Sequence, residues 1–252
     1  HRQFLGITSL AHSSSLSYDL NAPWRDTMVR IEGGGVYGLQ RAFLVDWYFV
    51  DRTLISNRKY YPSLKGYCVN DCVAQVVTST PVTPSPEIMQ GLLGVIMRAR
   101  RYIYIQTPYF IPNETILVAL KTAVLAGVDV RIMVPKRCDS RFVQWAGQSY
   151  LADIAAAGVK VLCYAEGFLH SKLWVVDDTL SSCGSTNVDF RSFENNFEAN
   201  VFFYDRDLAM RFKSVFETDE QRCVPYDVAK EKRRKFGIRL WESLMRLLSP
   251  LF

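Results

Sequence analysis

Residues 102–135, YIYIQTPYFIPNETILVALKTAVLAGVDVRIMVP, decide the fold class of this 252-residue chain. The apolar run 102–106 has the length of a buried strand, and Asn113 then provides an N-cap for a helix that ends at Gly127. A second stretch, 128–134, which is apolar except at Asp129 and Arg131, predicts the next buried strand. A buried strand, a helix and another buried strand in direct succession predict an α/β sheet covered by helices.

The alternation of helices and strands continues on both sides of this stretch. One amphipathic helix precedes it, and another follows it and ends at Gly158. After Tyr164 the connections shorten, which indicates neighbouring strands joined by turns. The other predicted elements are strands at 24–31, 73–77, 159–164, 170–176, 181–186 and 198–204, and helices at 36–51, 86–101, 140–157, 206–218 and 230–248.

The composition is that of a folded globular protein with a mild basic excess. Hydrophobic residues make up 49% and charged residues 22%, and 30 basic against 25 acidic residues give a net charge of +5. This excess suits an anionic partner, either nucleic acid or an acidic lipid surface. The six cysteines lack the spacing of a zinc site, so we expect reduced thiols and a cytoplasmic compartment.

Of the three histidines, only His170 lies in a clearly patterned segment. It begins a predicted strand in which Lys172 is two residues away, so both side chains should point to one face. An imidazole can attack phosphorus or protonate a leaving oxygen, and an ammonium group offsets charge on the other phosphate oxygens. Taken singly, each residue also has a structural explanation, as a hydrogen-bonded strand histidine and a solvated lysine.

Further polar positions follow at short range. Ser185 and Asn187 are two apart beside Gly184, so a hydroxyl and an amide converge on the same site if their strand neighbours the first one. Asp177 has the opposite parity and should hold the strand end at a turn rather than touch substrate. Glu198 opens the following strand, where its carboxylate could hydrogen-bond the imidazole and fix its tautomer.

Together these residues form the HKD motif, and the chain resembles the phospholipase D superfamily in it. The motif reads His170-x-Lys172-(x)4-Asp177-(x)6-Gly184-Ser185-x-Asn187. Outside the motif, the chain resembles the bacterial cardiolipin synthases of that superfamily from residue 24 onward. The stretches that carry this resemblance are 24–27, 30–33, 103–112, 127–135, 189–193, 196–198 and 242–251.

The resemblance implies a mixed sheet flanked by helices, largely the second half of a two-motif pseudo-dimer. Residues 1–80 would be the remnant of the first half and the start of a linker, and 81–252 the second domain. The implied reaction transfers a phosphatidyl group between two phosphatidylglycerol molecules through a phosphohistidine and releases glycerol, with no metal or other cofactor. The implied catalytic residues are His170, Lys172, Asp177 and a partner histidine, His1, and the implied phosphate-binding residues are Gly184, Ser185 and Asn187.

The first motif departs from the family pattern. His1-Arg2-Gln3 stands where His-Arg-Lys is expected, Thr8 occupies the aspartate position, and residues 13–15 replace a glycine-rich segment. The chain begins at His1 without a signal peptide or an apolar stretch long enough to span a bilayer, so we expect a missing upstream part with the membrane anchor. That half, or a second chain, would complete the site on the cytoplasmic side of the bacterial cell membrane.

Other functions stay open at this point. A single-motif phosphodiesterase or nuclease would build its site by pairing two identical chains, although the likeness to lipid synthases favours phosphatidylglycerol and an anionic membrane over nucleic acid. A catalytically inactive module would explain Gln3 and Thr8. The basic residues within 230–235 could meet anionic headgroups or form a solvated helix face.

Overall fold

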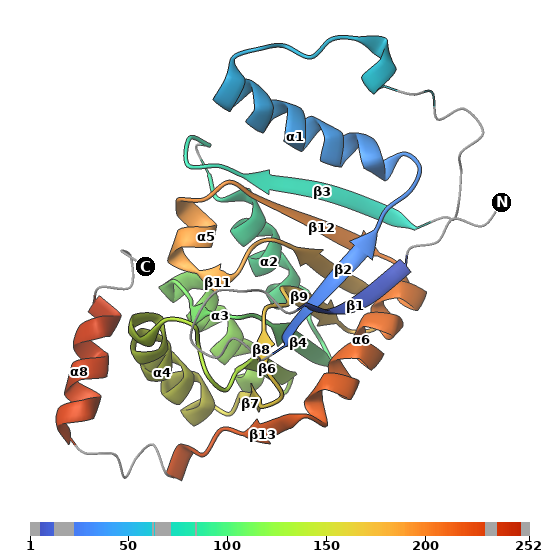
Figure 1. The fold of residues 1–252 in the computed structure, drawn as a ribbon. Helices are drawn as coiled ribbons and strands as arrows, with labels where there is room; N and C mark the ends of the chain where they lie inside the picture. Colours follow the sequence, from blue (N-terminus) through green and yellow to red (C-terminus); the bar gives the residue numbers. More distant parts are fainter. Residues whose placement is uncertain are drawn as a thin grey trace.

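The protein is an α/β structure centred on an eight-stranded mixed sheet (Figure 1). The computed structural model describes residues 6–12, 23–61, 63, 72–83, 85–229 and 236–247. In their order across the sheet, the strands are β13 (Cys223–Pro225), β7 (Lys160–Tyr164), β6 (Asp129–Pro135), β4 (Tyr102–Gln106), β9 (Leu173–Val176), β10 (Leu180–Gly184), β12 (Glu198–Tyr204) and β3 (Val73–Ser79).

The connections explain why one half of the sheet is parallel and the other antiparallel. β4, β6 and β7 run parallel, because a helix carries the chain from each strand to the next. β9 and β10 are joined by a tight turn and pair antiparallel, and β9 also pairs antiparallel with β4. The carboxyl ends of the parallel strands therefore lie beside the start of β9, which follows His170 and Lys172.

Helices cover both faces of the sheet and create two cores. The helices α2 (Glu87–Arg98), α3 (Glu114–Leu125) and α4 (Arg141–Ala156) cover one face, and α6 (Arg206–Glu220) covers the other. Ile103 and Ile105 of β4 belong to the first core, whereas Tyr102 and Tyr104 belong to the second. Alternate residues of the strand are thus buried on opposite faces, which explains its unbroken apolar sequence.

Smaller elements surround the main sheet. A three-stranded sheet contains β1 (Gly6–His12), β2 (Trp24–Arg30) and β8 (Phe168–Leu169), with β2 antiparallel to β1 and parallel to β8. After β2, the helix α1 (Gly35–Asp51) lies alongside β3 (Figure 1). Further elements are β5 (Phe110–Ile111), β11 (Val188–Asp189), α5 (Phe190–Glu194), the 3-10 helix η1 (Arg58–Tyr60) and α8 (Phe236–Leu247). The helix α8 packs on α4.

The structure confirms the predicted caps of the helix between β4 and β6. Asn113 accepts a hydrogen bond from the Ile116 amide at 3.1 Å, and Gly127 has a φ of +87°. In the described part of the chain, none of the helices combines the length and the apolarity needed to cross a bilayer.

Three expectations need revision. The weakly patterned beginning contains β1, and His170 and Lys172 precede the regular strand β9 instead of lying within it. The predicted strand at 181–186 ends at Gly184. The predicted boundary between residues 80 and 81 stays a prediction, but β3 pairs with β12, so residues from both sides of that boundary build one sheet. The basic run at 230–235 lies outside the described residues.

Candidate active site

His170 and Lys172 lie in the segment between β8 and β9, beside the carboxyl ends of the parallel strands. The amide of His170 donates to the Arg25 carbonyl of β2 at 2.8 Å, which extends the β2–β8 pairing by one residue. The Lys172 ammonium donates to the His170 carbonyl at 2.6 Å, and Lys172 is only 8% exposed. The imidazole remains 31% exposed, so it is open to a phosphodiester while the lysine lies beneath the surface.

The carboxylate that contacts His170 is Asp26 of β2. Nδ1 of His170 lies 3.1 Å from Oδ2 of Asp26, across 144 residues of sequence. Because a carboxylate only accepts, a neutral imidazole here carries its proton on Nδ1 and keeps the lone pair of Nε2 for attack on phosphorus. The expectation that Glu198 bonds this imidazole is wrong. Glu198 instead accepts hydrogen bonds from the Ser185 hydroxyl and from the Asn196 amide, the latter at 3.1 Å.

Burial and neighbouring charges shift the pKa values of Asp26 and Lys172, which form a cluster with His170. Burial would raise the pKa of Asp26, but the hydrogen bond to His170 and the charges of His170 and Lys172 bring that pKa below its ordinary value. Burial lowers the pKa of Lys172 to about 8, although the carboxylates of Asp26, Glu198 and Asp189 oppose the shift. The imidazole and the ammonium thus share Asp26, which supports the expectation that their side chains lie together.

Gly184 is the last residue of β10, which neighbours β9 as expected, and Ser185 follows it. Glycine is required at 184, since a Cβ there would lie 2.1 Å from Oδ1 of Asn200 and 2.3 Å from the Ala199 carbonyl. This close approach allows the Ser185 hydroxyl to accept from the Ala199 amide at 3.0 Å and to donate to Glu198. The close backbone approach predicted at Gly184 is therefore confirmed, and the meeting of the Ser185 hydroxyl with the Asn187 amide at a phosphate stays a prediction.

Asn187 contacts the cluster through Asp189. Its amide nitrogen donates to Oδ2 of Asp189 at 3.1 Å, and its carbonyl oxygen is buried without a hydrogen-bond partner among the described residues. Asp189 also caps α5 by accepting from the Ser192 amide at 2.6 Å, yet burial keeps its pKa raised. Asp189 was not singled out in the sequence. It connects Asn187 to the charge of Lys172.

Asp177 lies at the opposite end of β9 from His170. Its φ is +55°, and its carboxylate accepts from three consecutive amides, those of Arg100 at 2.6 Å and of Arg101 and Tyr102 at 2.8 Å each. The carboxylate therefore fixes the beginning of β4 against the end of β9. This confirms the predicted location at a turn, away from the phosphate site.

A buried polar network supports β2 beneath the site. Arg25 forms a bidentate ion pair with Asp219 of α6, with distances of 2.9 Å and 2.7 Å, and the two side chains are 8% and 3% exposed. Gln106 at the end of β4 donates to the same carboxylate at 2.8 Å. Because Arg25 precedes Asp26 in the strand, this ion pair holds the strand that carries the histidine's carboxylate. Sequence reasoning did not find Arg25, Asp219 or Gln106.

Aromatic rings flank the imidazole. The ring centroid of His170 lies 4.8 Å from that of Trp24 and 6.0 Å from that of Phe168. His1, the predicted partner histidine, lies outside the described residues. Among the residues that the structure does describe, no cluster of three or more histidine, cysteine, aspartate or glutamate side chains is arranged to hold a metal ion.

A mixed sheet with a paired histidine and a buried lysine at the start of a central strand defines the phospholipase D class of folds. Solved structures of this class match the chain. Nuc of Salmonella typhimurium, a phospholipase D family member, has a TM-score of 0.52 and 23% identity, over 62% of this chain and 99% of that one. Phosphatidylserine synthase of Haemophilus influenzae has a TM-score of 0.59 and 14% identity, over 72% and 48%. At these identities the match shows the fold alone.

The chain belongs to the family described as "Cardiolipin synthase, PLD-like domain", whose model matches residues 92–220. Similar curated proteins include the cardiolipin synthase of Oceanobacillus iheyensis, 42% identical over 229 residues, and the major cardiolipin synthase ClsA of Bacillus subtilis, 40% identical over 232 residues. Each alignment covers 90% of this chain and 47% of the relative. The chain thus spans about half the length of the curated relatives it matches.

Proposed function

We propose that the complete protein is a phosphatidyltransferase that makes cardiolipin and glycerol from two phosphatidylglycerol molecules. The observation that carries this proposal is the His170–Asp26 pair beside the buried ammonium of Lys172. Identity of about 40% to cardiolipin synthases over 90% of the chain supports the choice of lipid substrates.

The proposed reaction has two steps. An imidazole Nε2 attacks the donor phosphorus, a P–N bond forms, the P–O bond to glycerol breaks, and a second histidine protonates the departing alkoxide. The acceptor hydroxyl then attacks the phosphohistidine, the P–N bond breaks, and the acceptor's proton passes to the second histidine. Lys172 with Ser185 and Asn187 stabilises the charge on the phosphate oxygens. His1 is the proposed second histidine.

We propose that this activity takes place at the bacterial cell membrane, on its cytoplasmic side. Phosphatidylglycerol is anionic, and the net charge of +5 favours approach to an anionic surface.

The test is a lipid assay of the full-length protein and its His170→Ala variant. The wild type is expected to convert phosphatidylglycerol to cardiolipin, and the variant is expected to lose this activity while its circular dichroism spectrum and melting temperature stay close to wild type. Undiminished cardiolipin synthesis in the folded variant would end the proposal.

Two further measurements separate the alternatives. A homodimeric nuclease would degrade DNA and elute as a dimer in gel filtration, whereas a protein that leaves DNA intact excludes that function. Trapping phosphohistidine after mixing with substrate would exclude an inactive module, and its loss in Lys172→Met would connect the intermediate to the site described here.

A further inference from the structure

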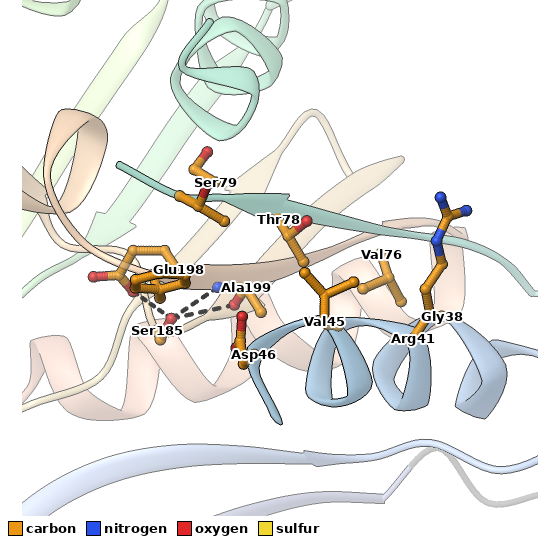
Figure 2. Close-up of a pocket in the computed structure, with 13 residues that line it drawn as sticks. Gly38, Arg41, Val45, Asp46, Val76, Thr78, Ser79, Ser185, Glu198 and Ala199 are labelled. Carbon is orange, nitrogen blue, oxygen red and sulfur yellow. Dashed lines mark hydrogen bonds between the residues drawn. The ribbon is translucent and has the colours of Figure 1, made fainter. Parts of the chain in front are cut away.

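A pocket of about 570 Å³ lies between α1 and the strands β3 and β12, and its lining includes Ser185 (Figure 2). This volume is within the range of about 300–1,000 Å³ that is typical of small-molecule sites. Ser185 and Glu198 line the pocket, and the Glu198 carboxylate also acts on the ammonium of Lys172. A molecule bound in the pocket would therefore lie next to a phosphate held by His170 and Lys172.

The pocket follows the length of α1. The helix approaches β3 so closely at Gly38 that a Cβ there would lie 2.7 Å from Cγ2 of Val76, and only glycine permits this contact. From Gly38 to Asp46 the helix axis advances about 12 Å. Figure 2 shows Gly38 and Arg41 at one end, and Asp46 at the other end, close to Ser185.

The lining carries polar groups that the fold does not use. The side chains of Arg41, Asp46 and Thr78 line the pocket and form no hydrogen bond or ion pair within the part of the chain that the structure describes. The neighbouring Ser79 hydroxyl, in contrast, accepts from the Ile88 amide at 3.1 Å. A cation, an anion and a hydroxyl match a ligand with one phosphate and several hydroxyl groups, and they would be left unpaired by a fatty acyl chain.

We propose that this pocket binds the glycerophosphate headgroup of the acceptor lipid. The inference rests on the proposed function, in which the acceptor is a second phosphatidylglycerol. Asp46 and Thr78 hydrogen-bond the glycerol hydroxyls at the end next to Ser185. Arg41 pairs with the acceptor's own phosphate, and its Cα lies about 7.5 Å further along the helix axis, which suits the spacing between the two parts of the headgroup.

This arrangement gives the pocket a role in choosing the acceptor. Water and a glycerol hydroxyl compete for the same phosphohistidine, and transfer wins only if the hydroxyl is held near phosphorus. A headgroup fixed by Arg41 and Asp46 presents its terminal hydroxyl beside Ser185, where it also displaces water. The pocket thus favours cardiolipin over phosphatidic acid, the product of hydrolysis.

The test measures both products of the full-length protein on phosphatidylglycerol in mixed micelles. Arg41→Gln and Asp46→Asn are each expected to lower the ratio of cardiolipin to phosphatidic acid about tenfold, the factor that one charge-assisted hydrogen bond contributes. Arg206→Gln and Asp207→Asn remove matched exposed charges on α6, outside the pocket, and should keep the wild-type ratio. An unchanged ratio in both pocket variants would overturn the inference.

A binding measurement distinguishes failure of this inference from failure of the proposed function. Glycerol 3-phosphate is titrated into the full-length His170→Ala protein, and Arg41→Gln in that background should weaken binding about tenfold. If the wild type makes no cardiolipin but this difference persists, the proposed function fails and the pocket stands as a glycerophosphate site. If cardiolipin forms and Arg41→Gln changes neither the product ratio nor the binding, the pocket assignment alone fails.

Discussion

The burial of Lys172 affects both the charge available for the reaction and the stability of the fold. The residue is 8% exposed, and its pKa falls to about 8 because burial outweighs the attraction of the charges on Asp26, Glu198 and Asp189. The charge is therefore present at neutral pH but is lost within the alkaline range that enzymes tolerate.

We expect turnover to fall as the pH rises through about 8, since Lys172 then loses the charge that stabilises the phosphate oxygens. Lys172→Arg keeps its charge at all accessible pH values, so its lower activity should lack this alkaline decline. The measurement is kcat/KM of the full-length enzyme between about pH 6 and pH 10. An identical decline near pH 8 in the arginine variant would assign it to another group.

The same burial destabilises the fold at neutral pH. The pKa of Lys172 is about 8 in the folded protein against an ordinary 10.5, so between these values the unfolded chain binds more protons and stability rises with pH. Below about pH 8 the buried ammonium lowers the free energy of unfolding by the full amount, about 3 kcal/mol. Lys172→Met should therefore raise the free energy of unfolding at pH 7 by about 1–3 kcal/mol while abolishing activity. Urea unfolding checks this, and a less stable variant would contradict it.

Asp26 defines the orientation of the imidazole. Its lowered pKa keeps it ionised throughout the neutral range, so Asp26→Asn removes a charge as well as an acceptor. We expect kcat to fall about 10- to 100-fold, as is usual when the partner of a functional histidine is lost. Glu32→Gln, two residues beyond the end of β2 and paired only with Arg30 among the described residues, is the matched control. Equal kcat values for the two variants would contradict the role of Asp26.

The sequence revealed His170, Lys172, Asp177 and Ser185 because their spacing is local. It did not reveal Asp26, since that contact depends on the parallel pairing of β2 with β8, which joins segments more than a hundred residues apart. The available signal was the consecutive polar run Arg25-Asp26-Thr27 within a predicted strand. Arg25 and Thr27 are buried, and buried polar side chains need hydrogen-bond partners from other elements.

At the scale of elements, β2 is held to the main body by the Arg25–Asp219 ion pair between this strand and α6. A bidentate pair with both side chains less than 10% exposed leaves an uncompensated buried charge when one partner is removed. Gln106 shares the same carboxylate, so the end of β4 belongs to this contact as well. The ion pair therefore connects three elements beneath His170.

Arg25→Met and Asp219→Leu are each expected to lower the free energy of unfolding by about 3–5 kcal/mol. The double variant Arg25→Met/Asp219→Leu should recover most of that loss, because no charge then remains buried. Denaturant unfolding of the two single variants and the double variant gives the coupling energy. Additive losses would show that the two residues do not act as a pair.

Long helices and strands were predicted more accurately than very short ones. The helices with an apolar stripe and a capping residue, such as α3, and the strand β12 were located within a residue or two. Two-residue strands such as β5, β8 and β11 carry no periodic pattern of their own. They exist because neighbouring segments pair with them, so a single sequence does not reveal them.

At the scale of the whole molecule, α1 differs from the helices that cover the main sheet. None of its residues is buried, and its large apolar side chains are exposed, among them Phe43 at 57% and Val50 at 83%. A helix that is apolar on most sides is normally enclosed by a partner. The α/β class and the two faces of the core were predictable from the strand and helix pattern, whereas this open surface depends on what lies against it.

The 252-residue chain by itself is therefore expected to bind a hydrophobic dye and to associate at micromolar concentration. Phe43→Glu combined with Val50→Glu should reduce both effects, because charges on the helix oppose contact. Val118→Glu with Leu125→Glu, at exposed apolar positions of α3, is the matched control. Dye fluorescence and sedimentation velocity provide the measurements, and equal behaviour of the two double variants would exclude α1 as the cause.

The parallel contact between β2 and β8 comprises two residue pairs, Trp24 with Phe168 and Arg25 with Leu169. We expect so short a pairing to open at a lower temperature than the eight-stranded sheet, once the Arg25–Asp219 ion pair no longer holds β2. The imidazole would then lose its carboxylate while the helices are still intact, so heat inactivation should precede melting of the secondary structure. On cooling, activity should return only when β2 pairs with β8 again.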